Sequence, residues 1–163
     1  MSEASLSLRE LLAWSDETTR RWLRFLAENS SLQTEPCGIY GSENVLELVR
    51  HIVAVELRHS QRLAGIPTTA VTDLPLNLAA LEEIHLETMK RLGALLDDQG
   101  QDWAEVMEFS TLTMGLLRAS RRKVLAHTLL HGIRHWAQVS TLARSAGFEA
   151  GIFGDLLASS ALE

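Results

Sequence analysis

A chain of 163 residues, 46% of them hydrophobic and 22% charged, is long enough to bury a core, and we expect residues 1–163 to form a single domain. Its formal net charge of −6 argues against nucleic-acid binding, which normally requires a basic surface. The lone cysteine, Cys37, cannot form an intramolecular disulfide, which favours the reducing cytoplasm. The N-terminus lacks the basic and then apolar layout of a signal peptide. No apolar run approaches the ~20 residues that cross a bilayer. A cytoplasmic protein without membrane contact is therefore expected.

Apolar residues at helical spacing predict a first helix over residues 6–29, with an apolar face at both ends and a more polar middle. Prolines and glycines make residues 30–42 a predicted loop. Ser42 is the expected N-cap of a second helix, which ends before Gly65.

A third helix is predicted over residues 77–98, closed by Gly100. Residues 103–117 mix β-branched, aromatic and helix-forming side chains, and we expect an irregular or extended crossing segment there. A fourth helix is predicted over residues 120–145, followed by a short closing helix over residues 152–160. Together these elements predict an all-α four-helix bundle, with a long crossing connection before the fourth helix.

The histidines of the fourth helix are the chemically most informative feature of the sequence. His127, His131 and His135 follow one another at intervals of four residues, so any two neighbours share a helix face and can point at one metal ion. Spacing alone does not choose between the two pairs, although His131 belongs to both. His51, among apolar neighbours in the second helix, is a candidate third ligand, and three ligands leave coordination positions open. An isolated histidine of this kind is more often a core-edge side chain bonded to a carbonyl.

Other polar residues near these histidines are weaker candidates. His59 lies about 80° around the helix from His51 and is expected to face solvent rather than support a ligand. His85 lies in a charged stretch and is expected at the surface. Glu56 occupies a poor ligand position, and Glu47 is either an acceptor for His51 or, more simply, an exposed carboxylate. Trp136 is expected in the core rather than in a pocket.

Two further features have simple interpretations. The basic cluster from Arg118 to Lys123 opens the fourth helix, where an anionic substrate could compensate for its charge. A solvated cluster beside acidic side chains of another element is the simpler account. Cys37 has no activating neighbour in sequence, so a nucleophilic role is not expected.

The fourth-helix stretch LLHGIRHWAQVSTLARSAGF resembles the signature of the DinB/YfiT-like proteins. That signature has two histidines four residues apart on a leucine-rich helix, then a Gln-hydrophobic step and an Arg-x-x-Gly ending. The run His51-Ile-Val-Ala-Val agrees with the single histidine that these proteins carry early in the second helix. The likeness extends over nearly the whole chain in helix order. One departure is visible, since many members continue with His-Arg-Gly-Gln where this chain has His135-Trp-Ala-Gln, and this puts the substrate class in doubt.

The resemblance implies a four-helix bundle that holds a divalent metal, commonly zinc or nickel, with manganese and iron as further candidates. By position, it implies His51, His131 and His135 as the metal ligands and leaves His127 outside the set. Several relatives use the metal to activate a low-molecular-weight thiol such as bacillithiol, mycothiol or glutathione.

The expected function is therefore a metal-dependent thiol S-transferase that takes a small-molecule thiol and an electrophile. No general base is visible at a fixed spacing, which suits thiolate chemistry better than hydrolysis. The alternatives are a non-catalytic metal-binding or small-ligand-binding protein of a stress response, a metal-dependent hydrolase, and a structural bundle. A homodimer formed through an apolar helix face is a further expectation.

Overall fold

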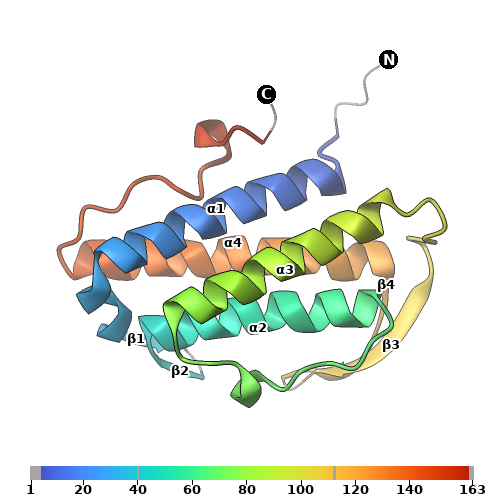
Figure 1. Ribbon diagram of the computed structural model, residues 1–163, viewed down its shortest axis with the longest axis horizontal. Coiled ribbons are helices and arrows are strands. Elements are labelled where there is room, and N and C mark those ends of the chain that lie inside the picture. Colours follow the sequence, from blue (N-terminus) through green and yellow to red (C-terminus); the bar gives the residue numbers. More distant parts are fainter. Residues whose placement is uncertain (1–4, 40, 112, 162–163) are drawn as a thin grey trace.

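The computed structural model describes residues 5–39, 41–111 and 113–161, so the predictions for the first loop and the crossing segment each include one residue outside the described part. The described chain is mostly helical, with four long helices and two small antiparallel sheets (Figure 1). The helices are α1 (Leu8–Glu28), α2 (Val45–Leu63), α3 (Leu78–Asp97) and α4 (Arg121–Ser145), with short 3-10 turns at η1 (Ser30–Thr34), η2 (Val71–Asp73) and η3 (Leu156–Ala158).

The four helices pack side by side, and each contacts two others. α1 packs against α3 and α4, and α2 packs against the same two helices (Figure 1). This arrangement follows from the amphipathic sequences, since each helix buries its apolar stripe against two neighbours. Its consequence for function is that α2 and α4, which carry five of the six histidines, run alongside each other.

The core contains more polar side chains than the sequence pattern predicts. Ser15, Thr18 and Thr19, the polar middle of α1, are fully buried. Trp136 is buried as expected; its ring stacks on that of Trp22 with 6.0 Å between centroids. Its indole N–H donates a hydrogen bond of 2.8 Å to the Thr19 hydroxyl, which satisfies the polar end of a buried aromatic side chain.

The predicted loop before α2 contains a small sheet that the sequence did not indicate. β1 (Pro36–Ile39) and β2 (Ser42–Asn44) pair antiparallel. Ser42 lies in β2 and does not cap α2, so that prediction was wrong. Extended backbone continues to Asn44, whose side-chain oxygen accepts a 3.0 Å hydrogen bond from the Glu47 N–H and caps the helix instead.

The connection before α4 is a β-hairpin rather than a crossing segment. β3 (Val106–Thr111) and β4 (Gly115–Ser120) pair antiparallel in continuous register. Gly115, with a φ of 66°, allows the chain to reverse. The sequence predicts extended backbone here, but not the second strand that pairs with the first. An all-α description is therefore too narrow for this protein.

The helix ends agree with the sequence at some positions and not at others. α4 begins beside Ser120, as predicted, and Ser120 caps it by accepting a hydrogen bond from the Lys123 N–H. α3 ends at Asp97 with Asp98 as its C-cap, so Gly100 does not close it. The C-terminal segment contains one 3-10 turn, η3, instead of the predicted closing helix. Among the described residues, no helix is both long and apolar enough to cross a membrane.

Candidate metal centre

Three histidines from α2 and α4 meet where these helices run side by side. The Nε2 atom of His131 lies 3.2 Å from Nε2 of His51 and 3.1 Å from Nε2 of His135. His131 and His135 are buried, whereas His51 is half-buried. One nitrogen from each residue lies within 4.8 Å of the others, so this three-histidine site could hold a metal ion.

The donor set fits a divalent transition metal. Nitrogen ligands about 2.05 Å from a tetrahedral zinc ion are separated by about 3.3 Å, close to the spacings that His131 makes with its two partners. Three nitrogen lone pairs directed at one point are costly to bury unless they share a partner, and one metal ion satisfies all three.

Burial keeps these imidazoles in the neutral form. It lowers the pKa of His51 to about 4, with smaller contributions from His135 and Arg134. Burial also lowers the pKa of His131 to about 2, and it lowers the pKa of His135 as well. A neutral imidazole has a free lone pair, so the site is ready to bind a metal at pH 7 without first losing protons.

Gln138 fixes the orientation of one of these rings. Its side-chain oxygen lies 2.6 Å from Nδ1 of His135, three residues earlier on α4. Because a carbonyl oxygen only accepts, Nδ1 carries the proton and Nε2 has the lone pair that faces the other two histidines. The sequence motif contained this glutamine, but its i, i+3 spacing was not recognised as support for a ligand.

Substituting Gln138 by leucine is expected to weaken metal binding about 10- to 100-fold, the usual cost of losing the acceptor that orients a metal-binding histidine. Gln138→Glu retains an acceptor and should bind metal at least as tightly as the wild-type protein. Competition with a chromophoric chelator measures both affinities, and Gln99→Leu, at an exposed glutamine in the turn after α3, is the control. Equal affinity in Gln138→Leu and the wild-type protein would exclude this role.

His127 and His59 lie beside the three-histidine site but outside it. The His127 ring is exposed, with its centroid 5.7 Å from that of His131 and 5.9 Å from that of His59. His59 is buried, so the expectation that it faces solvent was wrong. The unpredicted β3–β4 hairpin accounts for this, because Phe109 of β3 packs edge-on against the His59 ring at 5.8 Å. Burial, followed by the charge of Arg62, lowers the pKa of His59 to about 3.

His85 also contradicts its prediction, since it is fully buried rather than at the surface. Its Nδ1 lies 2.8 Å from Oε2 of Glu56, and its Nε2 lies 2.9 Å from Oδ1 of Asp16. Burial alone lowers the pKa of His85, but the charges and hydrogen bonds of Glu56 and Asp16 outweigh it and raise the pKa to about 9. His85 is therefore an imidazolium ion at pH 7, and these three residues form a buried ion cluster that joins α1, α2 and α3.

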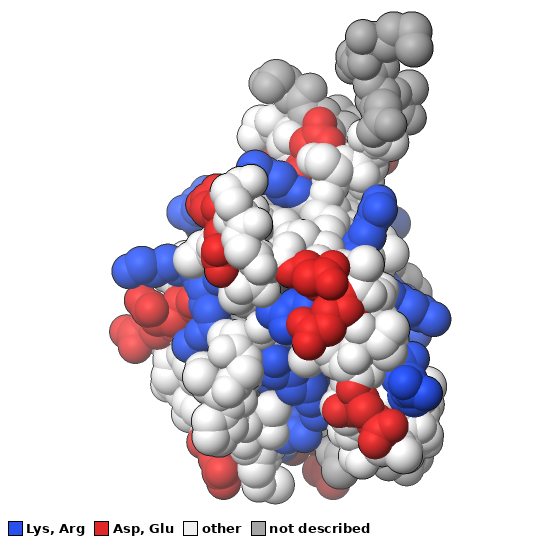
Figure 2. All heavy atoms as spheres, turned by 90° about the vertical axis from the view of Figure 1, so that its right-hand side faces the viewer, with Lys and Arg blue, Asp and Glu red and all other residues white. Residues whose placement is uncertain are grey.

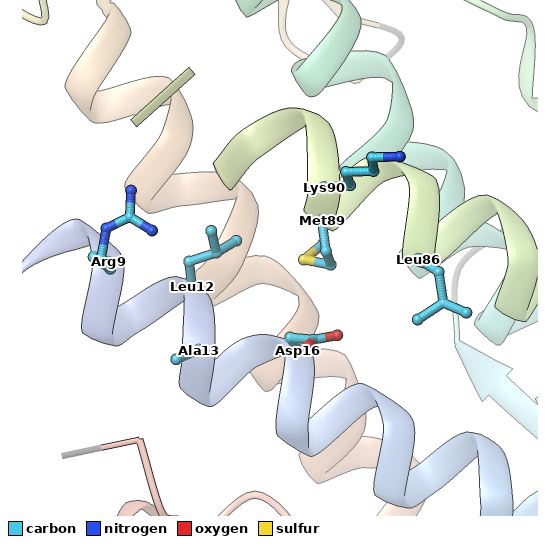
Figure 3. Close-up of a pocket in the computed structure, with 7 residues that line it drawn as sticks. All are labelled: Arg9, Leu12, Ala13, Asp16, Leu86, Met89 and Lys90. Carbon is cyan, nitrogen blue, oxygen red and sulfur yellow. The ribbon is translucent and has the colours of Figure 1, made fainter. Parts of the chain in front are cut away.

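The buried ion cluster reaches the surface on one side only. Glu56 is fully buried, whereas Asp16 is partly exposed and lines a groove between α1 and α3 (Figure 3). No histidine lines this groove, so it is separate from the three-histidine site. It is lined by Arg9, Leu12, Ala13, Asp16, Leu86, Met89 and Lys90.

The remaining polar candidates have structural explanations. Arg118 and Arg121 of the basic cluster lie 3.9 Å and 3.5 Å from Glu108 and Glu105. Basic and acidic side chains are interspersed on the end of the molecule in Figure 2. Glu47 accepts a hydrogen bond from the Glu43 N–H, and no bond links it to His51 in the described part of the chain. These contacts account for the other polar candidates, so the convergence of His51, His131 and His135 is the arrangement that calls for a functional explanation.

Comparison with known proteins identifies the family. A family model described as the DinB family matches residues 1–160. The chain belongs to the DinB family. No curated protein matches the sequence. Membership of the DinB family, together with the three convergent imidazoles, is compatible with metal binding and confirms the resemblance noted in the sequence.

Proposed function

We propose that this DinB protein is a single-domain, four-helix-bundle metalloprotein of the cytoplasm that binds one divalent metal at His51, His131 and His135 and uses it in thiol S-transfer. Zinc and nickel are the favoured ions. The observation that carries the proposal is the convergence of three neutral imidazole nitrogens with no fourth protein ligand in the described chain. Sites with three protein ligands retain open positions for substrate.

A divalent metal at this position supplies Lewis acidity, which lowers the pKa of a bound thiol so that it is a thiolate near neutral pH. The protein's own residues hold the ion and keep it partly shielded from water. His51, the half-buried ligand, marks the side from which a substrate could approach. None of the acidic side chains described lies within the donor set, which supports thiolate attack over hydrolysis by a water and a carboxylate base.

Thiol S-transfer can be tested with a chlorodinitroarene and a panel of bacillithiol, mycothiol and glutathione. In the expected reaction the thiolate forms a carbon–sulfur bond, chloride leaves with the carbon–chlorine bond electrons, and the thiol proton passes to solvent. We expect metal-dependent turnover with at least one thiol, lost after chelation and restored by the ion. Metal binding without turnover by any thiol would instead support a non-catalytic role in metal or ligand binding.

A further inference from the structure

Arg134 lies immediately beside the nitrogen atoms that face the centre of the three-histidine site. One of its guanidinium nitrogens, Nη2, is 3.4 Å from Nε2 of His135. The guanidinium has only donors and is always charged, so it interacts here with the same lone pair that a metal ion would take.

Two arginines of α2 already donate hydrogen bonds to backbone carbonyls. Arg58 donates to the carbonyl of Thr69, and Arg62 donates to the carbonyl of Ser110. Arg134 is exposed and forms no salt bridge with any residue that the structure describes. Its guanidinium is therefore available to a ligand of the site.

The site around Arg134 lacks negative charge. Within the described chain, no carboxylate joins the three converging imidazoles, and the ion pairs between a histidine and a carboxylate all belong to His85. Neutral imidazoles leave the full charge of a divalent ion uncompensated. A dication and a guanidinium that converge on one nitrogen repel each other, and an anion between them would offset that repulsion.

We propose that Arg134 is an anion-recognition residue, and that the site takes a small ligand with a carboxylate or phosphate oxyanion, one oxygen facing the metal and another accepting from the guanidinium. A planar guanidinium fork matches the spacing of two oxygens in such a group. This inference rests on the metal site of the proposed function, but it does not depend on thiol transfer. It deepens that function by assigning the substrate class: a thiol or acceptor that carries an acidic group.

The test uses the cobalt(II)-substituted protein, whose visible absorption reports ligands that bind the metal. Acetate, inorganic phosphate and neutral acetamide are titrated at constant ionic strength. We expect saturable spectral changes with one or both anions and none with acetamide. Arg134→Gln should weaken the binding of the anion by about 10- to 100-fold, because it removes a hydrogen bond from a charged donor. Its cobalt content should equal or exceed that of the wild-type protein.

Arg144→Gln, an exposed arginine further along α4, is the matched control and should bind anions as the wild-type protein does. Equal anion affinity in Arg134→Gln and the wild-type protein, with cobalt bound to both, would overturn the role of Arg134 alone. Binding of acetamide as tight as that of acetate would also overturn it. Failure of the wild-type protein to bind cobalt at all would overturn the metal site, and with it this inference; the metal content distinguishes that outcome before any anion is added.

Discussion

Replacing His131 by alanine is expected to reduce bound divalent metal from close to one equivalent to below about a tenth of an equivalent. His131 is the central residue of the site, because its Nε2 atom lies within 3.2 Å of that of His51 and 3.1 Å of that of His135. Without it, His51 and His135 remain as two ligands from different helices, and two imidazoles rarely retain a transition metal. Elemental analysis of untagged protein measures the loss.

His127→Ala is the matched control, since it removes an exposed imidazole one helical turn earlier on α4. It should retain nearly all of the metal. Thermal unfolding in excess chelator shows whether either variant is misfolded, because all three proteins should then unfold at similar temperatures. Equal metal loss in the two variants would contradict the assignment of the ligands, and wild-type protein without metal would contradict the site itself.

Replacing His85 by leucine is expected to lower the free energy of unfolding by about 3–5 kcal/mol, the usual cost of breaking a buried ion pair by removing one partner. The reason is the environment of Glu56, which is fully buried and accepts from the His85 ring at 2.8 Å. In His85→Leu this carboxylate has lost its cation inside the core. The double variant Glu56→Leu/His85→Leu removes the two fully buried charges and leaves only Asp16, which is partly exposed to solvent. It should recover most of the lost stability, since apolar replacements of buried ion pairs are often neutral.

The contribution of His85 should also depend on pH. Its pKa is raised to about 9 in the folded protein, against about 6.5 in an unfolded chain, so folding binds a proton between these values. The stabilisation is fully present below about pH 6.5 and is lost as the pH rises through about 9. Urea unfolding of wild-type protein and His85→Leu at pH 6, 8 and 10 measures this, with chelator present throughout.

The difference in unfolding free energy between these two proteins should shrink from pH 6 to pH 10. His127→Leu, a substitution of an exposed histidine, is the control and should change stability by less than about 0.5 kcal/mol. A loss below about 1 kcal/mol in His85→Leu would show that the buried ion cluster does not stabilise the fold. A double variant no more stable than His85→Leu would show that the loss comes from packing and not from the stranded carboxylate.

The helices could be predicted from the sequence because each carries an amphipathic repeat long enough to define its ends within a few residues. The two hairpins could not. β1 and β2 are only four and three residues long, too short for alternation to show. In β3 and β4, aromatic and β-branched residues indicated extended backbone, but pairing depends on contacts that a local pattern does not contain.

The candidate metal site was predictable in part. Four-residue spacing left two pairs of histidines open, His51 was a candidate third ligand from its place in the second helix, and the family resemblance selected His131 and His135. The position of His85 was predicted wrongly because its charged sequence neighbours were given more weight than its register. That of His59 was predicted wrongly because its angle from His51 does not reveal the hairpin that covers it. His85 lies four residues from both Leu81 and Met89, so it falls on the buried stripe of α3. Their partners come from other helices and from the hairpin, which the sequence does not place.

The position of the ligands along the chain also determines when the site can form. His51 and His131 are 80 residues apart, and the three imidazoles come together only in a segment that extends from His51 to His135. At a synthesis rate of about 5–20 residues per second, the nascent chain waits roughly 4–16 seconds between the two helices. Metal binding would therefore follow the packing of α4 against α2. It would then stabilise the folded state by about 4 kcal/mol at a free ion concentration a thousandfold above the dissociation constant. In such a protein, bound metal would indicate that α4 has packed against α2.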